Sequence, residues 1–381
     1  MEFDWSVEDA AYRKEFVDFL GEILPENWDE ISKHGPGSDL QAEFSKKFCG
    51  KMADKGWLTQ HWPAEYGGKD AGAWRHAVVG EECWAIGEPR GSQYMNVNWV
   101  GPAVMQYGTD EQKKLHLPAI ASGNIFWCQG FSEPEAGSDL VSLRTLAIPD
   151  GDDYVINGTK IWTSYVQHAN YCFLLARTDP DSKRHTGISV FLVPMETPGI
   201  EVREIPSVVG ARYFHEVFFT DVRVPKGCML GEVNAGWEVV NFALQYERVG
   251  AARYARAALT LDHLAKVAKE TGLMDDPIVV DKLAQARCIC EAARMLTYRV
   301  IDTRAKDAKP TTDTQLARIA GTRTDRAIGE LAVEILGPDA LEYGSFADAN
   351  FRLAMTAGVA VGATEVQLNL VARRFLELPK K

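Results

Sequence analysis

The spacing of apolar residues changes twice along this chain of 381 residues, and that change constrains its fold most. Up to residue 124, apolar side chains recur about every 3.6 positions, as in "VEDAAYRKEFVDFLGEIL", which predicts amphipathic helices. From 125 to 233, β-rich runs alternate with the hairpin dipeptides Asp-Gly and Asn-Gly. The helical period then returns in three long segments, the first over 236–272, and two shorter ones. We therefore expect an α+β protein with a helical domain (1–124), a barrel-like antiparallel β domain (125–233) and a C-terminal four-helix-type bundle (234–381).

Charge and composition exclude several classes of function. The net charge of −12 argues against a nucleic-acid partner, because phosphate binding needs a basic surface. No apolar run approaches the roughly 20 residues of a membrane span, and the opening stretch does not resemble a signal peptide. The seven cysteines and eight histidines are scattered and form no Cys-x-x-Cys, so we expect a reduced, cytoplasmic protein without a metal site. No Gly-x-Gly-x-x-Gly follows a predicted strand.

The loop "FSEPEAGSDL", residues 131–140, is a candidate binding site. Ser132, Gly137 and Ser138 combine short hydroxyls with exposed backbone amides where the chain leaves the first predicted strand. Such a loop allows a phosphate or a flavin edge to approach closely. An acidic turn capped by Ser138 and Asp139 explains the same residues equally well.

The predicted strand "NGTKIWTS" places Trp162 next to two hydroxyl residues, Thr163 and Ser164. The indole ring could stack on a flavin. A tryptophan in a β domain is more often part of the core, and the residues by themselves favour that interpretation.

A carboxylate stands in an otherwise apolar helix in "QYERVGAAR", residues 245–253. Glu247 has Ala243 one turn before it, and Gly250 and Ala251 one turn after it, so no cation lies on that face. Desolvation there would raise the pKa of the carboxyl towards neutrality, as suits a general base. The alternative is a solvated glutamate beside Arg248.

These motifs together resemble the acyl-CoA dehydrogenases. "FSEPEAGSDLVSLRTLA", "YVINGTKIWTS", "ARTDP" and "LQYERVGAA" follow one another in a helix-β-helix chain, and the resemblance covers essentially its whole length. It implies an FAD-dependent α,β-dehydrogenation of an acyl-CoA thioester to the trans-2-enoyl-CoA, with electrons passing to an electron-transfer flavoprotein. The resemblance implies six FAD-binding positions. Phe131 and Ser132 would approach the edge of the flavin ring, Trp162 would cover the ring face away from the substrate, and Ser164 would bond near N5. Gly137 and Ser138 complete the set, with Ser138 at the flavin phosphate or the substrate pantetheine.

The resemblance also implies where the catalytic base lies. Most members of the family carry a glutamate at the position of Val361, which cannot take a proton. Fewer carry it in the "ER" pair of the first bundle helix, which here gives Glu247. Arg248 would then lie near the base and Gly250 and Ala251 would leave room for the acyl group.

Glu365 follows Val361 by four residues, at the start of the last predicted helix. We expect it to cap that helix or to face solvent, and not to take part in the reaction.

Two departures from the family pattern suggest a second subunit. The arginine that reaches the neighbouring subunit's FAD is missing from "KVAKETGLMDDP", residues 266–277, and "EILGP" places Glu334 and Pro338 where the family has Gln and Gly. An acid repels a pyrophosphate and proline removes an amide donor. We therefore expect a second, non-identical acyl-CoA dehydrogenase-like subunit in an α2β2 heterotetramer, a type of assembly associated with bulky, branched or steroid side-chain acyl groups. A catalytically silent scaffolding subunit and an oxygen-using relative, an acyl-CoA oxidase or flavin monooxygenase, are the alternatives.

Overall fold

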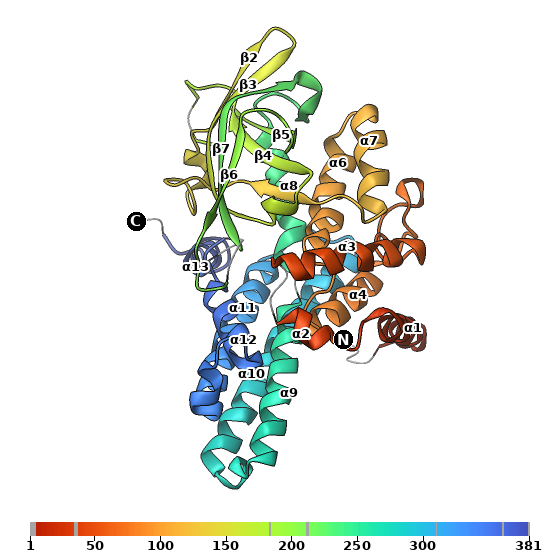
Figure 1. Cartoon of the computed structure of the whole chain (residues 1–381), viewed down its shortest axis with the longest axis vertical. Helices are drawn as coiled ribbons and strands as arrows, with labels where there is room; N and C mark the ends of the chain where they lie inside the picture. Colours follow the sequence, from red (N-terminus) through yellow and green to blue (C-terminus); the bar gives the residue numbers. More distant parts are fainter. Residues whose placement is uncertain are drawn as a thin grey trace. The chain divides into compact units, whose positions relative to one another are not determined.

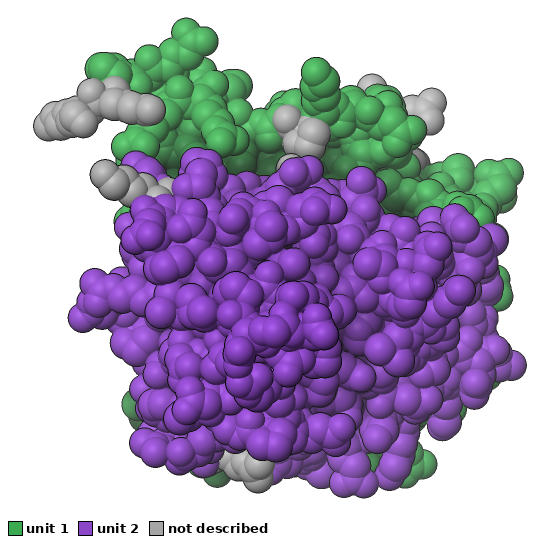
Figure 2. Space-filling model, turned by 90° about the horizontal axis from the view of Figure 1, so that it is seen from above, with its two compact units in different colours: residues 1–36, 70–89, 248–381 green, residues 37–69, 90–247 purple. Residues whose placement is uncertain are grey.

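The computed structural model describes residues 5–33, 37–182, 184–210, 213–250, 252–309, 311–359 and 362–379, with the backbone alone for 245–250. Figure 1 draws the whole chain as a cartoon. The chain divides into two compact units. Unit 1 comprises residues 1–36, 70–89 and 248–381, and unit 2 comprises 37–69 and 90–247. Figure 2 colours the two units green and purple. Since the division falls inside one helix, between Glu247 and Arg248, that helix belongs partly to each unit.

Unit 2 joins a helical part to a β-sheet. Its helices are α3 (Asp39–Asp54), α5 (Gln93–Met95), α6 (Gly101–Tyr107), α7 (Asp110–Ala121) and most of α8 (Gly236–Gly250). Its strands are β1 (Trp127–Gly130), β2 (Leu146–Asp150), β3 (Asp153–Ser164), β4 (Tyr171–Arg177), β5 (Ile188–Pro194), β6 (Ile200–Ile205), β7 (Phe214–Pro225) and β8 (Met229–Leu230). The start of α7 follows the predicted signal, because Thr109 and Gln112 form a capping box.

The eight strands form one sheet in the order β6-β7-β3-β2-β4-β5-β8, with β1 beside β4. Most pairs are antiparallel, as predicted, whereas β1 runs parallel to β4 along its whole length. Alternate side chains from one face of the strands, among them Ile156, Leu174, Phe191 and Val222, form a buried core of this domain. Strands β6, β7 and β3 lie side by side in Figure 1.

One of the two predicted hairpin turns is wrong. The Asp150-Gly151 turn joins β2 to β3 as expected, but Asn157-Gly158 lies inside β3. There the side chain of Asn157 accepts a hydrogen bond from the backbone N–H of Asp221, 2.9 Å away, across a β-bulge in β7. A Cβ at Gly158 would lie 2.4 Å from the hydroxyl of Thr145, so the glycine serves a close approach rather than a turn.

The described residues of unit 1 form helices and the loops that connect them, without a strand. Its helices are α1 (Val7–Ile23), α2 (Trp28–Ser32), α4 (Ala73–Ala85), the end of α8, α9 (Arg253–Glu270), α10 (Pro277–Ala305), α11 (Asp313–Leu336), α12 (Phe346–Thr356) and α13 (Thr364–Arg374). The prediction of one helix over 236–272 is wrong, because the helix ends at Gly250 and α9 begins at Arg253. Glycine has the weakest helix propensity after proline, and Ala252, at ψ 59°, is no longer helical.

Among the described residues, no helix has the length and apolar character to cross a membrane. No group of three histidine, cysteine or acidic side chains is placed to hold a metal ion in that part of the chain.

Candidate active site

The predicted binding loop leaves the end of β1 and folds back on itself. Glu133 and Ala136 exchange two backbone hydrogen bonds of 3.0 Å, which close a tight turn over the sequence "EPEA". Ala136 is buried beneath it, whereas Gly137 and Ser138 on its outer side are exposed. A Cβ added at Gly137 would meet nothing within 4 Å, so the space above this backbone is open. The loop therefore offers amides and a hydroxyl to a ligand.

Trp162 is exposed, and the interpretation of it as a core residue is wrong. Between Lys160 and Thr163, strand β3 has one residue more than its partner β7, which makes a β-bulge. Trp162 lies at this bulge with φ 60°, in the left-handed region, and its side chain is 55% exposed. Its ring meets Phe214 edge to face, with centroids 5.9 Å apart. The bulge turns the indole away from the core and leaves more than half of the side chain exposed.

The structure brings the loop and the tryptophan strand together. The backbone N–H of Ile161 donates to the carbonyl of Ser132 at 2.9 Å, directly before Trp162. Phe131 and Ser132 are partly buried at the base of the loop, and Ser164 is partly buried at the end of β3. The six predicted cofactor-binding positions thus share one unit, and hydrogen bonds join the two segments that carry them.

Two buried charged residues, Lys160 and Glu133, also join these segments, although the sequence alone did not point to them. The ammonium of Lys160, which is fully buried, donates to the Glu133 carboxylate at 2.8 Å and to the carbonyl of Phe131 at 3.1 Å. Glu133 also accepts from the backbone N–H groups of Arg144 and Thr145, at 2.6 and 2.9 Å. We call Lys160 and Glu133 the buried pair.

The buried pair perturbs the pKa of both groups. Burial raises the pKa of Glu133, but the charge of Lys160 and the hydrogen bonds outweigh it and hold that pKa below its ordinary value. Burial lowers the pKa of Lys160, and the charge of Glu133 offsets only part of that effect. With Glu133 at 7% exposure, each partner depends on the other for its charge.

The predicted base lies near the end of α8. Ala243, four residues before Glu247, is 2% exposed, so the helical stripe that leads to Glu247 faces inwards. The side chains of Glu247, Arg248 and Gly250, and all of Ala251, lie outside the described residues. Their roles in proton removal and in binding the acyl group stay predictions.

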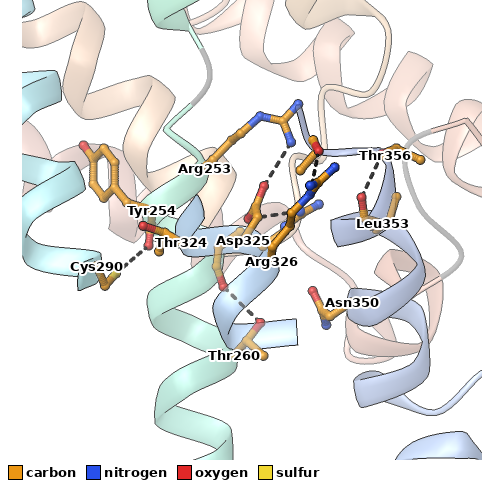
Figure 3. A network of polar contacts seen from close by, with 12 residues as sticks. Arg253, Tyr254, Thr260, Cys290, Thr324, Asp325, Arg326, Asn350, Leu353 and Thr356 are labelled. Carbon is orange, nitrogen blue, oxygen red and sulfur yellow. Dashed lines mark hydrogen bonds and ion pairs between the residues drawn. The ribbon is translucent and has the colours of Figure 1, made fainter. Parts of the chain in front are cut away.

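The segment that follows the predicted base is anchored in unit 1 (Figure 3). Asp325 of α11, whose side chain is 2% exposed, accepts from Arg253 at 3.0 Å and lies 3.3 Å from Arg256, both in α9. The thiol of Cys290 in α10 lies 3.2 Å from the carbonyl of Tyr254. Contacts from two helices therefore fix the first turns of α9, a few residues beyond Glu247.

The positions that depart from the family pattern lie in unit 1. Glu334 is exposed and forms an ion pair with Lys282 of α10, so a lysine of this chain already compensates its charge. Pro338 follows α11 in a short 3₁₀ helix. Glu365 is exposed in the first turn of α13, as predicted. Val361 lies outside the described residues.

These residues fit a flavin. The exposed flat ring of Trp162, a backbone without a side chain at Gly137 and an exposed hydroxyl at Ser138 match an isoalloxazine ring with a phosphate beside it. When bound, FAD supplies the hydride acceptor that no amino-acid side chain provides.

Comparisons with known proteins agree along the whole chain. Three family profiles match: acyl-CoA dehydrogenase N-terminal domain at residues 6–124, middle domain at 128–222 and C-terminal domain at 234–376. Acyl-CoA dehydrogenase IpdE1 of Mycolicibacterium smegmatis is 34% identical, over 98% of this chain and 99% of its own.

Two solved structures are also similar. The "Tcur3481-Tcur3483 steroid ACAD" is 31% identical with a TM-score of 0.91, and covers all of both chains. The ChsE4-ChsE5 complex from Mycobacterium tuberculosis is 30% identical with a TM-score of 0.88 over the same full lengths. The chain therefore belongs to the acyl-CoA dehydrogenase family, whose fold of helical, β and helical domains it has, and it is an oxidoreductase that acts on acyl-CoA.

Proposed function

We propose that this chain uses FAD to oxidise an acyl-CoA thioester to its trans-2-enoyl-CoA. The observation that carries the proposal is the exposed ring of Trp162 at a β-bulge, hydrogen-bonded through its neighbour to the loop of open amides at 131–138. In this proposal the FAD-binding residues are Phe131, Ser132, Gly137, Ser138, Trp162 and Ser164.

Glu247 is the proposed general base, which takes the proton from the carbon beside the thioester carbonyl. An apolar helical face favours the neutral carboxyl and so moves its pKa towards neutrality, where proton transfer is efficient. Arg248 lies next to it in α8, and Gly250 and Ala251 leave space for the acyl group. The inward-facing stripe that ends in Ala243 supports this placement.

We infer that the chain assembles with a second, non-identical acyl-CoA dehydrogenase-like subunit. The missing arginine at 266–277 and the acidic residue at 334 leave it without the groups that complete a neighbour's FAD site. Two similar solved structures are each named for two proteins, Tcur3481 with Tcur3483 and ChsE4 with ChsE5. The first is named as a steroid enzyme, which supports a bulky or steroid side-chain acyl group as the substrate. The electron-transfer flavoprotein as acceptor and the cytoplasmic location remain predictions of the same kind.

Anaerobic titration with a panel of acyl-CoA thioesters, from short fatty to steroid side-chain forms, tests the proposal. We expect the protein, purified with the subunits that accompany it in its own host, to be yellow and its flavin absorbance to bleach with the bulky substrates. A protein that binds no flavin in that assembly would be the silent subunit instead. Bleaching followed by peroxide release in air, without an electron acceptor, would indicate the oxidase.

A further inference from the structure

The buried pair, Lys160 and Glu133, lies directly under the two segments that carry the proposed flavin-binding residues. Lys160 immediately precedes the two residues, Ile161 and Trp162, that form the bulge, and Glu133 immediately follows Phe131 and Ser132. Among the hydrogen bonds of the described residues, the pair supplies the side-chain links between the two segments, and the backbone contact from Ile161 to Ser132 adds a further one.

The chain is packed closely at Gly130, the last residue of β1. A Cβ there would lie 2.7 Å from Cδ1 of Leu174 and 2.8 Å from the thiol of Cys172, so these two side chains require a glycine. The stem of Lys160 passes beside the same position, with its Cγ at 3.5 Å, which is an ordinary contact distance. From there its ammonium reaches the first carbonyl of the loop and the carboxylate two residues later.

A buried ion pair is an expensive way to stabilise a fold, because well-packed apolar residues of similar size often do as well. Here each charged group also holds backbone that an apolar pair could not hold. Lys160 binds the carbonyl of Phe131 at the start of the loop, and Glu133 binds two amides, of Arg144 and Thr145, just before β2 begins. The pair thus ties both ends of the segment 131–145 to the strand that carries Trp162.

We propose that Lys160 and Glu133 are positioning residues that set the spacing between the ring of Trp162 and the amides of the loop 131–138, and so the shape of the flavin slot. This inference rests on the proposed function for its ligand, FAD. It predicts that FAD affinity depends on the pair through geometry as well as through the stability of the fold.

Two variants separate these contributions. Lys160→Met keeps the volume but leaves the Glu133 carboxylate buried without a cation, and we expect a large fall in the melting temperature. Adding Glu133→Gln removes that charge. Its single amide oxygen replaces only one of the two carboxylate oxygens that accept from the N–H groups of Arg144 and Thr145, so the melting temperature recovers in part. The carbonyl of Phe131 stays without its donor in both variants. The matched control is Lys226→Met, which breaks an exposed ion pair with Asp152 in the turns beside the same sheet and should change nothing.

The measurements are the melting temperature, the FAD dissociation constant and the rate of tryptic cleavage after the exposed Arg144, which reports the loop without any flavin present. In the double variant we expect a melting temperature above that of Lys160→Met, cleavage faster than in wild type, and FAD binding weaker by about tenfold or more. The opposite result would be a double variant that regains stability, is cleaved at the wild-type rate and binds FAD with an affinity within about twofold of wild type. That result would show that the pair stabilises the fold and does not position the flavin slot. If the wild-type assembly binds no FAD, the proposed function itself fails, and the positioning role falls with it.

Discussion

His116 predicts an acid-sensitive step in the stability of unit 2. It projects from α7 with 4% exposure and meets the rings of Trp127 and Tyr171 edge to face, at 5.2 and 5.0 Å. Its Nδ1 has no hydrogen-bond partner among the described residues. Burial in these apolar surroundings lowers the pKa of His116 from 6.5 to about 4.

The magnitude follows from that difference. The folded protein favours the neutral imidazole, so its contribution is fully present above about pH 6.5 and is lost as the pH falls from there towards 4. A shift of this size corresponds to about 3 kcal/mol in total. Of this, about 2 kcal/mol is lost between about pH 7 and about pH 5. Because Trp127 lies in β1, which leads into the loop at Phe131, we expect the flavin to loosen in the same range.

Urea unfolding of wild type and His116→Phe at both pH values measures the effect. Phenylalanine keeps an aromatic ring between Trp127 and Tyr171 and removes the titration. We expect the free energy of unfolding to fall by about 2 kcal/mol less in the variant than in wild type. Burial also lowers the pKa of His61 to about 4, but this residue contributes equally to both proteins and cancels. Equal losses, within about 0.5 kcal/mol, would refute the reasoning.

Three further substitutions, the first with a matched control, test other contacts. Asp325→Ala leaves two partly buried arginines, one of them Arg253, without their carboxylate, and should lower the free energy of unfolding by about 3–5 kcal/mol in urea. The control is Asp262→Ala, which breaks an exposed ion pair and should lower the same free energy by less than about 1 kcal/mol. Trp162→Leu should weaken FAD binding by about tenfold or more in a fluorescence titration while circular dichroism stays unchanged, because the side chain is exposed. Gly158→Ala should lower the melting temperature, since its Cβ would lie 2.4 Å from a threonine hydroxyl, and it should destabilise by about 1–3 kcal/mol.

Periodicity predicted the type of nearly every element, because each segment is long enough to average over local exceptions. It could not predict the break after Gly250, where small residues continue the apolar pattern although the helix ends. It also misplaced a turn at Asn157, whose side chain bonds to Asp221 on a strand more than 60 residues later. Such long-range contacts override local turn preferences.

The site shows the same limit. The residues alone favoured a buried Trp162, because nothing local reveals a bulge that depends on the register of β3 with β7. Lys160 and Glu133 went unnoticed, since isolated charges in a sequence usually lie on the surface. One signal in the sequence could have pointed to them. Lys160 lies two positions before Trp162 in a predicted strand, and Glu133 lies in the candidate loop, so each charge adjoins a predicted binding residue.

The substitution Glu247→Gln tests the central assignment most directly, because it removes the proton acceptor and keeps the size of the side chain. We predict that the variant retains its flavin and binds acyl-CoA, yet loses the bleaching of flavin absorbance under anaerobic single turnover by about a thousandfold or more in rate. Bleaching at the wild-type rate would mean that another group takes the proton, and the assignment of Glu247 would be wrong.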